Sequence, residues 1–135
     1  MTRATLAGIA FLATFGALAA CKNDETVSAY GAADRVWHLV EIDEIDVTYA
    51  ATLRFPEPGQ IDGDGPCNRF RGAMTVPYPW FDAKGLIATR TACPELAGET
   101  QYLAALAHMT LSEVLGDTLI LSTPEGRTMV FVAAD

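Results

Sequence analysis

Glycine and proline interrupt this chain so often that only short structural elements fit between them. Eleven glycines and seven prolines are spread among its 135 residues. Because proline breaks a helix and glycine weakens one, this spacing argues against a long soluble helix bundle. Half of the residues are hydrophobic, which excludes a disordered polymer. The length corresponds to one domain.

The net charge narrows the range of partners. The chain has 17 Asp and Glu against 9 Lys and Arg, which gives a formal charge of −8. Nucleic acids select basic surfaces, and anionic lipids do the same. We therefore expect no nucleic-acid partner and no general electrostatic attraction to anionic lipid.

An uncharged apolar segment, residues 4–20, follows Arg3 near the start of the chain. One basic residue, an apolar run and a small-residue end are the layout of a secretory signal peptide. The alternative is a transmembrane helix, but this run of 17 residues is rich in alanine, and a span needs about 20 strongly apolar residues. We therefore interpret residues 1–20 as a signal peptide.

The end of this segment, Leu18-Ala19-Ala20-Cys21, resembles the lipobox of bacterial lipoproteins. The resemblance implies that the Cys21 sulfur receives a diacylglycerol, that a peptidase cuts before Cys21, and that the new amine is acylated, for instance with palmitate. Two or more acyl chains hold a protein stably on a membrane, since each buried methylene contributes about 0.8 kcal/mol. An ordinary signal peptide with a chance cysteine is the alternative.

This resemblance also implies a location. We expect a protein anchored by its lipid to the bacterial cell envelope and facing the periplasm. Lys22 is not the aspartate linked to inner-membrane retention in enteric bacteria, which favours the outer membrane. Residues 21–34 are polar and small, and they are predicted to form a tether between the lipid and a domain at 35–135.

Cys67 and Cys93 remain as a pair once Cys21 carries lipid. In an exported domain such a pair indicates one disulfide. The bridge closes a loop from residue 67 to residue 93 and is worth about 3–4 kcal/mol. Two reduced, buried thiols are the alternative. Neither cysteine has a Cys or His close by in the sequence, so a zinc site is not expected.

The domain itself has the pattern of short strands around one helix. Runs of β-forming residues between turn signals predict strands at 36–42, 51–55, 70–76 and 86–88. The sequence Cys93-Pro94-Glu95 predicts the start of a helix, whose firm part is 99–108. A hairpin at Gly116-Asp117 and a strand at 128–132 follow. The expected class is α+β, mainly β, with an antiparallel sheet.

Three motifs occur in the domain in a fixed order: Trp37-His38-Leu39, Cys67-Asn68-Arg69-Phe70-Arg71-Gly72 and Thr89-Arg90-Thr91-Ala92-Cys93-Pro94. They resemble the Trp-x-Leu opening, the Gly-Cys-Asn-x-Phe-x-Gly motif and the Thr-x-Met-Ala-Cys-Pro segment of META-domain proteins, the family of the heat-shock lipoprotein HslJ. The resemblance covers about residues 36–132. Pro66 and Thr91 depart from the usual small residue and methionine.

The resemblance implies a curled, barrel-like antiparallel sheet with one packed helix. It gives this chain no catalytic residues and no cofactor, and it links members of the family to heat shock, novobiocin resistance or motility. The motif residues are Trp37, Leu39, Asn68, Phe70, Gly72, Thr91 and Pro94. From their chemistry, Asn68 can bond neighbouring backbone groups, and a sharp turn is expected at Asp62-Gly63-Asp64-Gly65-Pro66.

Other candidate sites are weaker. Asp62 and Asp64 suggest calcium, but Pro66 stands where an EF-hand loop needs a further oxygen ligand. His38 fits the polar face of a strand, and the acidic residues of 41–46 fit a solvated turn. No serine lies in a nucleophile elbow. We expect neither a catalytic site nor a metal site.

The aromatic loop with Tyr78, Trp80 and Phe81 is the candidate surface for an unidentified protein partner, because exposed aromatic side chains mark contact sites. The alternative is that the loop covers one end of the barrel as core.

The sequence leaves three candidate functions, in ranked order. The first is a monomeric, non-enzymatic, stress-related envelope lipoprotein. The second is an inhibitor of an envelope hydrolase, and the third is a carrier of a small apolar molecule in a barrel cavity.

Overall fold

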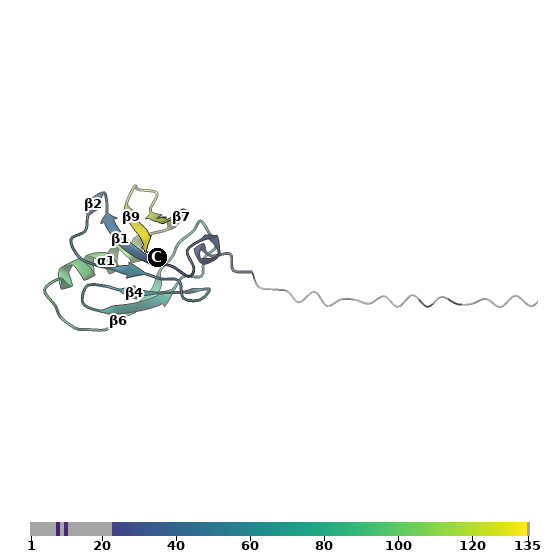
Figure 1. Cartoon of the computed structure of the whole chain (residues 1–135), viewed down its shortest axis with the longest axis horizontal. Coiled ribbons are helices and arrows are strands. Elements are labelled where there is room, and N and C mark those ends of the chain that lie inside the picture. Colours follow the sequence, from purple (N-terminus) through teal and green to yellow (C-terminus); the bar gives the residue numbers. More distant parts are fainter. Residues whose placement is uncertain (1–7, 9, 11–22, 135) are drawn as a thin grey trace, which may run out of the picture.

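The computed structural model describes residues 8, 10 and 23–134, which from residue 23 onward fold into two antiparallel sheets and one α-helix (Figure 1). The predicted lipid attachment at Cys21 lies outside the described residues, as does the predicted signal peptide apart from residues 8 and 10. In the described part, no helix combines the length and the apolar character that a bilayer crossing requires.

The larger sheet joins the first and last long strands of the domain. Its order is β2-β1-β9-β8-β7, with β3 also paired to β1. In the β1–β9 ladder, Leu39 lies opposite Phe131, and both side chains enter the core. The strands are β1 (Val36–Ile42), β2 (Ile45–Asp46), β3 (Thr52–Leu53), β7 (Leu111–Leu115), β8 (Thr118–Ser122) and β9 (Thr128–Ala134).

The smaller sheet has the order β4-β5-β6, with β4 at Gln60–Asp64, β5 at Arg69–Ala73 and β6 at Lys84–Ala88. The predicted sharp turn at 62–66 is wrong in its first half, because residues 62–64 belong to β4 and the chain turns at 65–68. Gly63 is required by packing. A Cβ there would lie 2.0 Å from the Thr52 carbonyl oxygen and 2.8 Å from the Phe70 ring.

Aromatic side chains fill the core between the sheets and the helix α1 (Leu96–His108). The rings of Phe70 and Tyr102 meet edge-on at 5.6 Å, and Tyr102 lies 6.3 Å from Phe131. The Tyr102 hydroxyl donates to the Thr52 carbonyl at 2.8 Å, and burial raises the Tyr102 pKa well above its usual value. The predicted mainly β, α+β class with one packed α-helix is confirmed, but the sheets pack together without closing into a barrel.

The packing around α1 explains why a glycine, which has a low helix propensity, occurs in its first turn. Gly98 lies in the first turn of α1, where a Cβ would come within 2.5 Å of the Tyr49 ring. The Tyr49 hydroxyl, in turn, donates to the Gln101 side chain at 3.1 Å. Gly98 therefore weakens the helix locally and allows the loop before β3 to pack on it.

The segment predicted as a tether is mostly part of the domain. A short 3-10 helix, η1, spans Val27–Tyr30, and the side chains of Val27 and Ala32 are fully buried. The Trp37 indole N–H donates to the Ala32 carbonyl at 2.9 Å, which ties this segment to β1. The expectation of a polar tether over 21–34 is therefore corrected, because apolar contacts hold its second half against the sheet.

Candidate functional site

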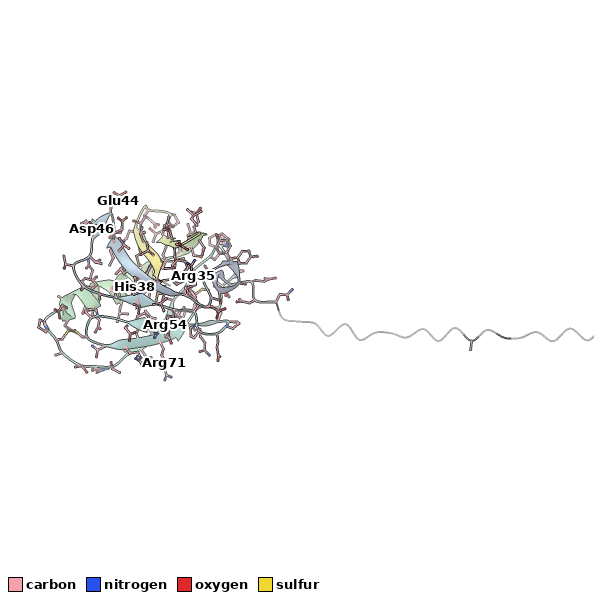
Figure 2. All side chains as sticks on the ribbon, in the orientation of Figure 1. Arg35, His38, Glu44, Asp46, Arg54 and Arg71 are labelled. Atoms are coloured by element: carbon pink, nitrogen blue, oxygen red, sulfur yellow. A yellow bond between two sulfur atoms is a disulfide. The ribbon has the colours of Figure 1, made fainter. Side chains whose placement is uncertain are left out.

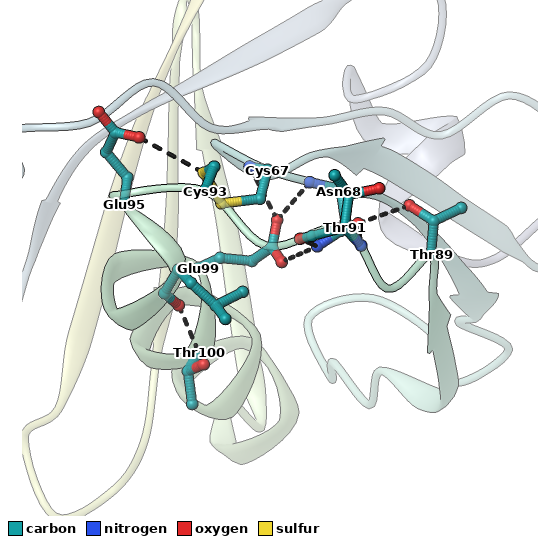
Figure 3. The surroundings of a disulfide bond; sticks show 9 residues. Cys67, Asn68, Thr89, Thr91, Cys93, Glu95, Glu99 and Thr100 are labelled. Carbon is teal, nitrogen blue, oxygen red and sulfur yellow. Dashed lines mark hydrogen bonds between the residues drawn. A yellow bond between two sulfur atoms is a disulfide. The ribbon is translucent and has the colours of Figure 1, made fainter.

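Glu99, in the first turn of α1, is a buried carboxylate at the centre of the family motifs (Figure 3). Its Oε1 accepts hydrogen bonds from the backbone N–H groups of Cys67 (3.1 Å) and Asn68 (2.6 Å). Its Oε2 accepts one from Asn68 Nδ2 at 2.6 Å. Within the described residues no cation lies within 4.0 Å of it. Three N–H donors therefore compensate for its loss of water.

Asn68 extends this network to the segment before the helix. Its Oδ1 accepts from the Thr91 N–H (2.6 Å) and the Thr89 hydroxyl (2.9 Å), and its Nδ2 also donates to the Thr91 carbonyl at 2.9 Å. Only an amide side chain offers a donor and an acceptor in this arrangement. The sequence predicted local backbone bonds for Asn68, but its partners are 21 to 31 residues away.

The predicted disulfide between Cys67 and Cys93 is confirmed, with 5.6 Å between the two Cα atoms. It lies beside the Glu99 network, because the Cys67 N–H is one of the three donors. Gly65 also belongs here, since a Cβ on it would lie 2.4 Å from Glu99 Oε1. Thr91 bonds Asn68 through its backbone, so its departure from the family methionine leaves these bonds intact.

We name Glu99, Asn68 and the Cys67–Cys93 disulfide the clamp, because together they join the β4–β5 turn, the segment 89–93 and the start of α1. The buried polar side-chain atoms of the clamp are all hydrogen-bonded. Sequence reasoning missed Glu99. The helical spacing could have indicated that Glu99 is buried, because it lies three residues before Tyr102 and seven before Leu106, on the apolar face of the helix.

The other motif residues have structural roles too. Trp37, Leu39 and Phe70 are buried in the core. A Cβ on Gly72 would lie 2.8 Å from the Lys84 carbonyl oxygen, so the glycine allows β5 and β6 to approach. Pro94 is exposed just before α1.

The aromatic loop is divided between core and surface. Phe81 is buried and its N–H donates to the Thr110 carbonyl at 2.9 Å, so its prediction as a partner contact is wrong. Trp80 is 57% exposed. The Tyr78 ring stacks on Tyr30 with 4.5 Å between centroids. Tyr30 was not predicted as part of this surface.

His38 and the acidic residues Glu44 and Asp46 lie at different places on the β1–β2 hairpin. His38 is exposed on β1, as predicted for the polar face of a strand, while Glu44 and Asp46 lie at the tip of the β1–β2 hairpin (Figure 2). At the same hairpin, a hydrogen bond from Arg127 lowers the Asp43 pKa.

Asp62 and Asp64, the pair considered for calcium, both face an arginine. Arg54 Nε lies 2.8 Å from Asp62 Oδ1, and Arg54 Nη2 lies 3.7 Å from Asp64 Oδ2. The hydrogen bond to Asp62 is also the main cause of a raised Arg54 pKa. The alternate spacing of the two aspartates places them on the outer face of β4, where they form these ion pairs.

A groove on the outer face of the smaller sheet was not predicted. It has a volume of about 630 Å³, and its lining includes Gln60, Asp62, Arg71, Lys84 and Ile87. A second hollow of about 360 Å³ shares Asp62, Arg71 and Ile87 with it. Arg71 lies directly opposite both Asp62 and Ile87 in the ladders, and Ile87 is 63% exposed.

The smaller sheet that forms the groove is rich in basic residues although the protein is acidic. Five of the seven lysines and arginines that the structure describes lie in the smaller sheet or directly beside it, at positions 54, 69, 71, 84 and 90. Arg69 and Lys84 pair with neighbouring aspartates at 3.2 Å. Within the described residues Arg71 has no ion-pair partner, and it points away from the body of the domain (Figure 2). The groove thus offers an unpaired guanidinium beside an exposed apolar side chain.

Comparisons with known proteins identify relatives of this fold. The family model of the META domain matches residues 31–135. An NMR structure of a protein from Burkholderia xenovorans is 21% identical, with a TM-score of 0.63, over 80% of this chain and 87% of that one. A crystal structure of a DUF4847 family protein from Bacteroides vulgatus is 13% identical, with a TM-score of 0.62, over 81% and 97%. A search of the curated proteins found no match.

Proposed function

The chain belongs to the META-domain family, and we propose that it is a lipid-anchored, non-enzymatic binding protein of the bacterial cell envelope. The lipobox pattern ending at Cys21 supports the anchor, and Lys22 favours the outer membrane with the domain in the periplasm. The resemblance to HslJ supports a role in stress. The domain would then act by holding a partner near the membrane.

The groove beside Arg71 is the observation that supports binding. A guanidinium is planar and can donate two parallel hydrogen bonds to one carboxylate. Ile87, on the neighbouring strand, offers an apolar contact next to it. Because most of the chain's excess negative charge lies elsewhere, an anionic partner is attracted to this face and repelled by others. The partner that fits is an acidic protein segment carrying an apolar side chain.

The buried polar residues support a structural role for the interior. Glu99 and Asn68 bond each other and the backbone. The buried Ser112 donates its hydroxyl hydrogen to the Pro79 carbonyl at 3.2 Å. Groups engaged in this way hold the fold together, and they are poorly placed to exchange protons with a substrate.

The two alternative functions gain no support. A carrier needs an internal cavity, whereas Trp37, Phe70, Tyr102 and Phe131 fill the space between the sheets, and the large groove lies outside it. An inhibitor that enters the cleft of a hydrolase needs a protruding loop. The aromatic loop is held down instead, since the Ser112 N–H donates to the Pro79 carbonyl at 2.7 Å.

The test is a titration of the 15N-labelled mature protein with an alternating Glu-Leu peptide, with a Lys-Leu peptide as control. We expect only the acidic peptide to shift the amide signals of Arg71 and Ile87. Arg71→Gln should weaken binding about tenfold, the equivalent of one lost charged hydrogen bond. Arg90→Gln removes the same charge from a residue outside the groove lining and should leave affinity nearly unchanged. Equal losses in the two variants would show general attraction and contradict the proposal.

A further inference from the structure

The chain becomes fixed to the domain almost directly after the proposed lipid site. The Asp24 carboxylate accepts hydrogen bonds from the Thr26 N–H (2.9 Å) and the Thr26 hydroxyl (2.6 Å). The Glu25 carbonyl accepts one from the Tyr78 N–H at 2.7 Å. Thr26 itself is buried. From residue 24 onward, the backbone therefore follows the surface of the domain.

The remaining link is short. Cys21 and Asp24 are three residues apart, and an extended chain spans at most about 3.3–3.6 Å per residue. Asp24 can therefore lie no farther than about 11 Å from a lipid-bearing Cys21. A bilayer that holds the lipid must then lie close to this end of the domain.

This end of the domain carries three aromatic side chains, the exposed Tyr30 and Trp80 and the half-buried Tyr78, which we name the aromatic end. Tyr78 bonds the Glu25 carbonyl through its backbone and stacks its ring on Tyr30. The backbone N–H of Trp80 donates to the Pro77 carbonyl at 2.8 Å, and this bond fixes the turn that presents the Trp80 side chain. Tyr30 is 55% exposed and Trp80 57%. Figure 1 shows η1, which contains Tyr30, where the chain enters the domain.

Tyrosine and tryptophan suit the headgroup region of a bilayer, because their rings are apolar and their O–H or N–H groups still find polar partners. Asp24 and Glu25 make anionic lipid unfavourable at this end, so the fitting surface is zwitterionic. In Figure 2, Arg71 lies apart from the point where the chain enters the domain.

We propose that the lipid surface itself covers the aromatic end, so that Tyr30, Tyr78 and Trp80 contact the headgroup region while the Arg71 groove is open to the periplasm. This inference rests on the lipid anchor at Cys21 proposed above. The short link brings the membrane to the aromatic end, and the aromatic rings give the domain a preferred orientation there.

The two tryptophans of the chain allow a direct test, because Trp37 is fully buried and Trp80 is exposed. The mature lipidated protein is incorporated into phosphatidylcholine vesicles whose acyl chains carry bromine, a short-range quencher of tryptophan fluorescence. We expect bromine to quench the wild-type fluorescence, and Trp80→Phe to remove most of that quenching. The matched control adds Ile87→Trp to Trp80→Phe, which places an exposed tryptophan at the groove. We expect this tryptophan to be quenched far less than Trp80.

Flotation of the vesicles in the same experiment separates the two proposals. Protein that fails to float with the vesicles refutes the lipid anchor. Protein that floats with Trp80 unquenched, or with Trp80 and the tryptophan at 87 quenched equally, refutes the orientation. If the protein floats with Trp80 unquenched, the aromatic end is open to a protein partner instead.

Discussion

Replacing Glu99 by alanine tests the clamp that joins the family motifs. The substitution removes the acceptor of three hydrogen bonds, from the backbone N–H groups of Cys67 and Asn68 and from the Asn68 side chain. These donors surround a side chain that is only 4% exposed. Without the carboxylate they lose their partners in a place where water enters only after rearrangement.

The expected cost follows from the number of donors. Each buried donor left without a partner costs about 1–3 kcal/mol. Water entering the vacated space will satisfy part of this loss, so we expect Glu99→Ala to lower the free energy of unfolding by about 3–5 kcal/mol. Glu99→Gln retains one oxygen for the two backbone donors but turns its own N–H₂ toward the Asn68 amide. We expect an intermediate cost of about 1–3 kcal/mol.

The assay is chemical denaturation of the mature protein with its disulfide intact. Glu95→Gln is the matched control, because Glu95 is exposed at the start of the same helix, and we expect a change within about 0.5 kcal/mol. A loss below about 1 kcal/mol for Glu99→Ala would refute the view that this carboxylate holds the clamp together.

Three further predictions concern stability. Replacing both disulfide cysteines by alanine should cost about 3–4 kcal/mol by the chain-entropy model, measured by the same denaturation. Gly98→Ala should destabilise the protein by about 1–3 kcal/mol despite its better helix propensity, because its Cβ would collide with the Tyr49 ring. The Asp43–Arg127 pair lowers the Asp43 pKa, so its stabilisation is present above the unfolded carboxyl pKa and is lost as pH falls through the folded one. Asp43→Asn should remove this acid-side slope, a few tenths of a kcal/mol for such an exposed pair, in unfolding curves measured at acidic pH.

The sequence predicted those features whose determinants are local or repeat with a regular period. The helix, its start after Pro94 and most strands followed from turn residues and apolar spacing. The disulfide followed from an even pair of cysteines in an exported domain. The resemblance to the META domain identified Asn68, although not its partners.

Features that depend on contacts between distant residues were missed. Glu99 receives its donors from residues 31 and 32 positions earlier, so no local rule identifies it as a buried acceptor. The groove combines Arg71 and Ile87 from different strands, and only the register of the smaller sheet brings them together. The segment from Asp24 to Ala32 looks polar and small, but its place against Trp37 and Tyr78 makes it part of the domain.

The proposed lipid at Cys21 underlies both the membrane anchor and the orientation of the domain, and the mass of the mature protein tests for it. The protein is purified from the membranes of its host, and its N-terminal fragment is measured by mass spectrometry. We predict a chain that begins at Cys21 and carries the added mass of a diacylglycerol and an amide-linked acyl chain. A chain that still begins at Met1, or one that begins elsewhere without lipid, would contradict the account.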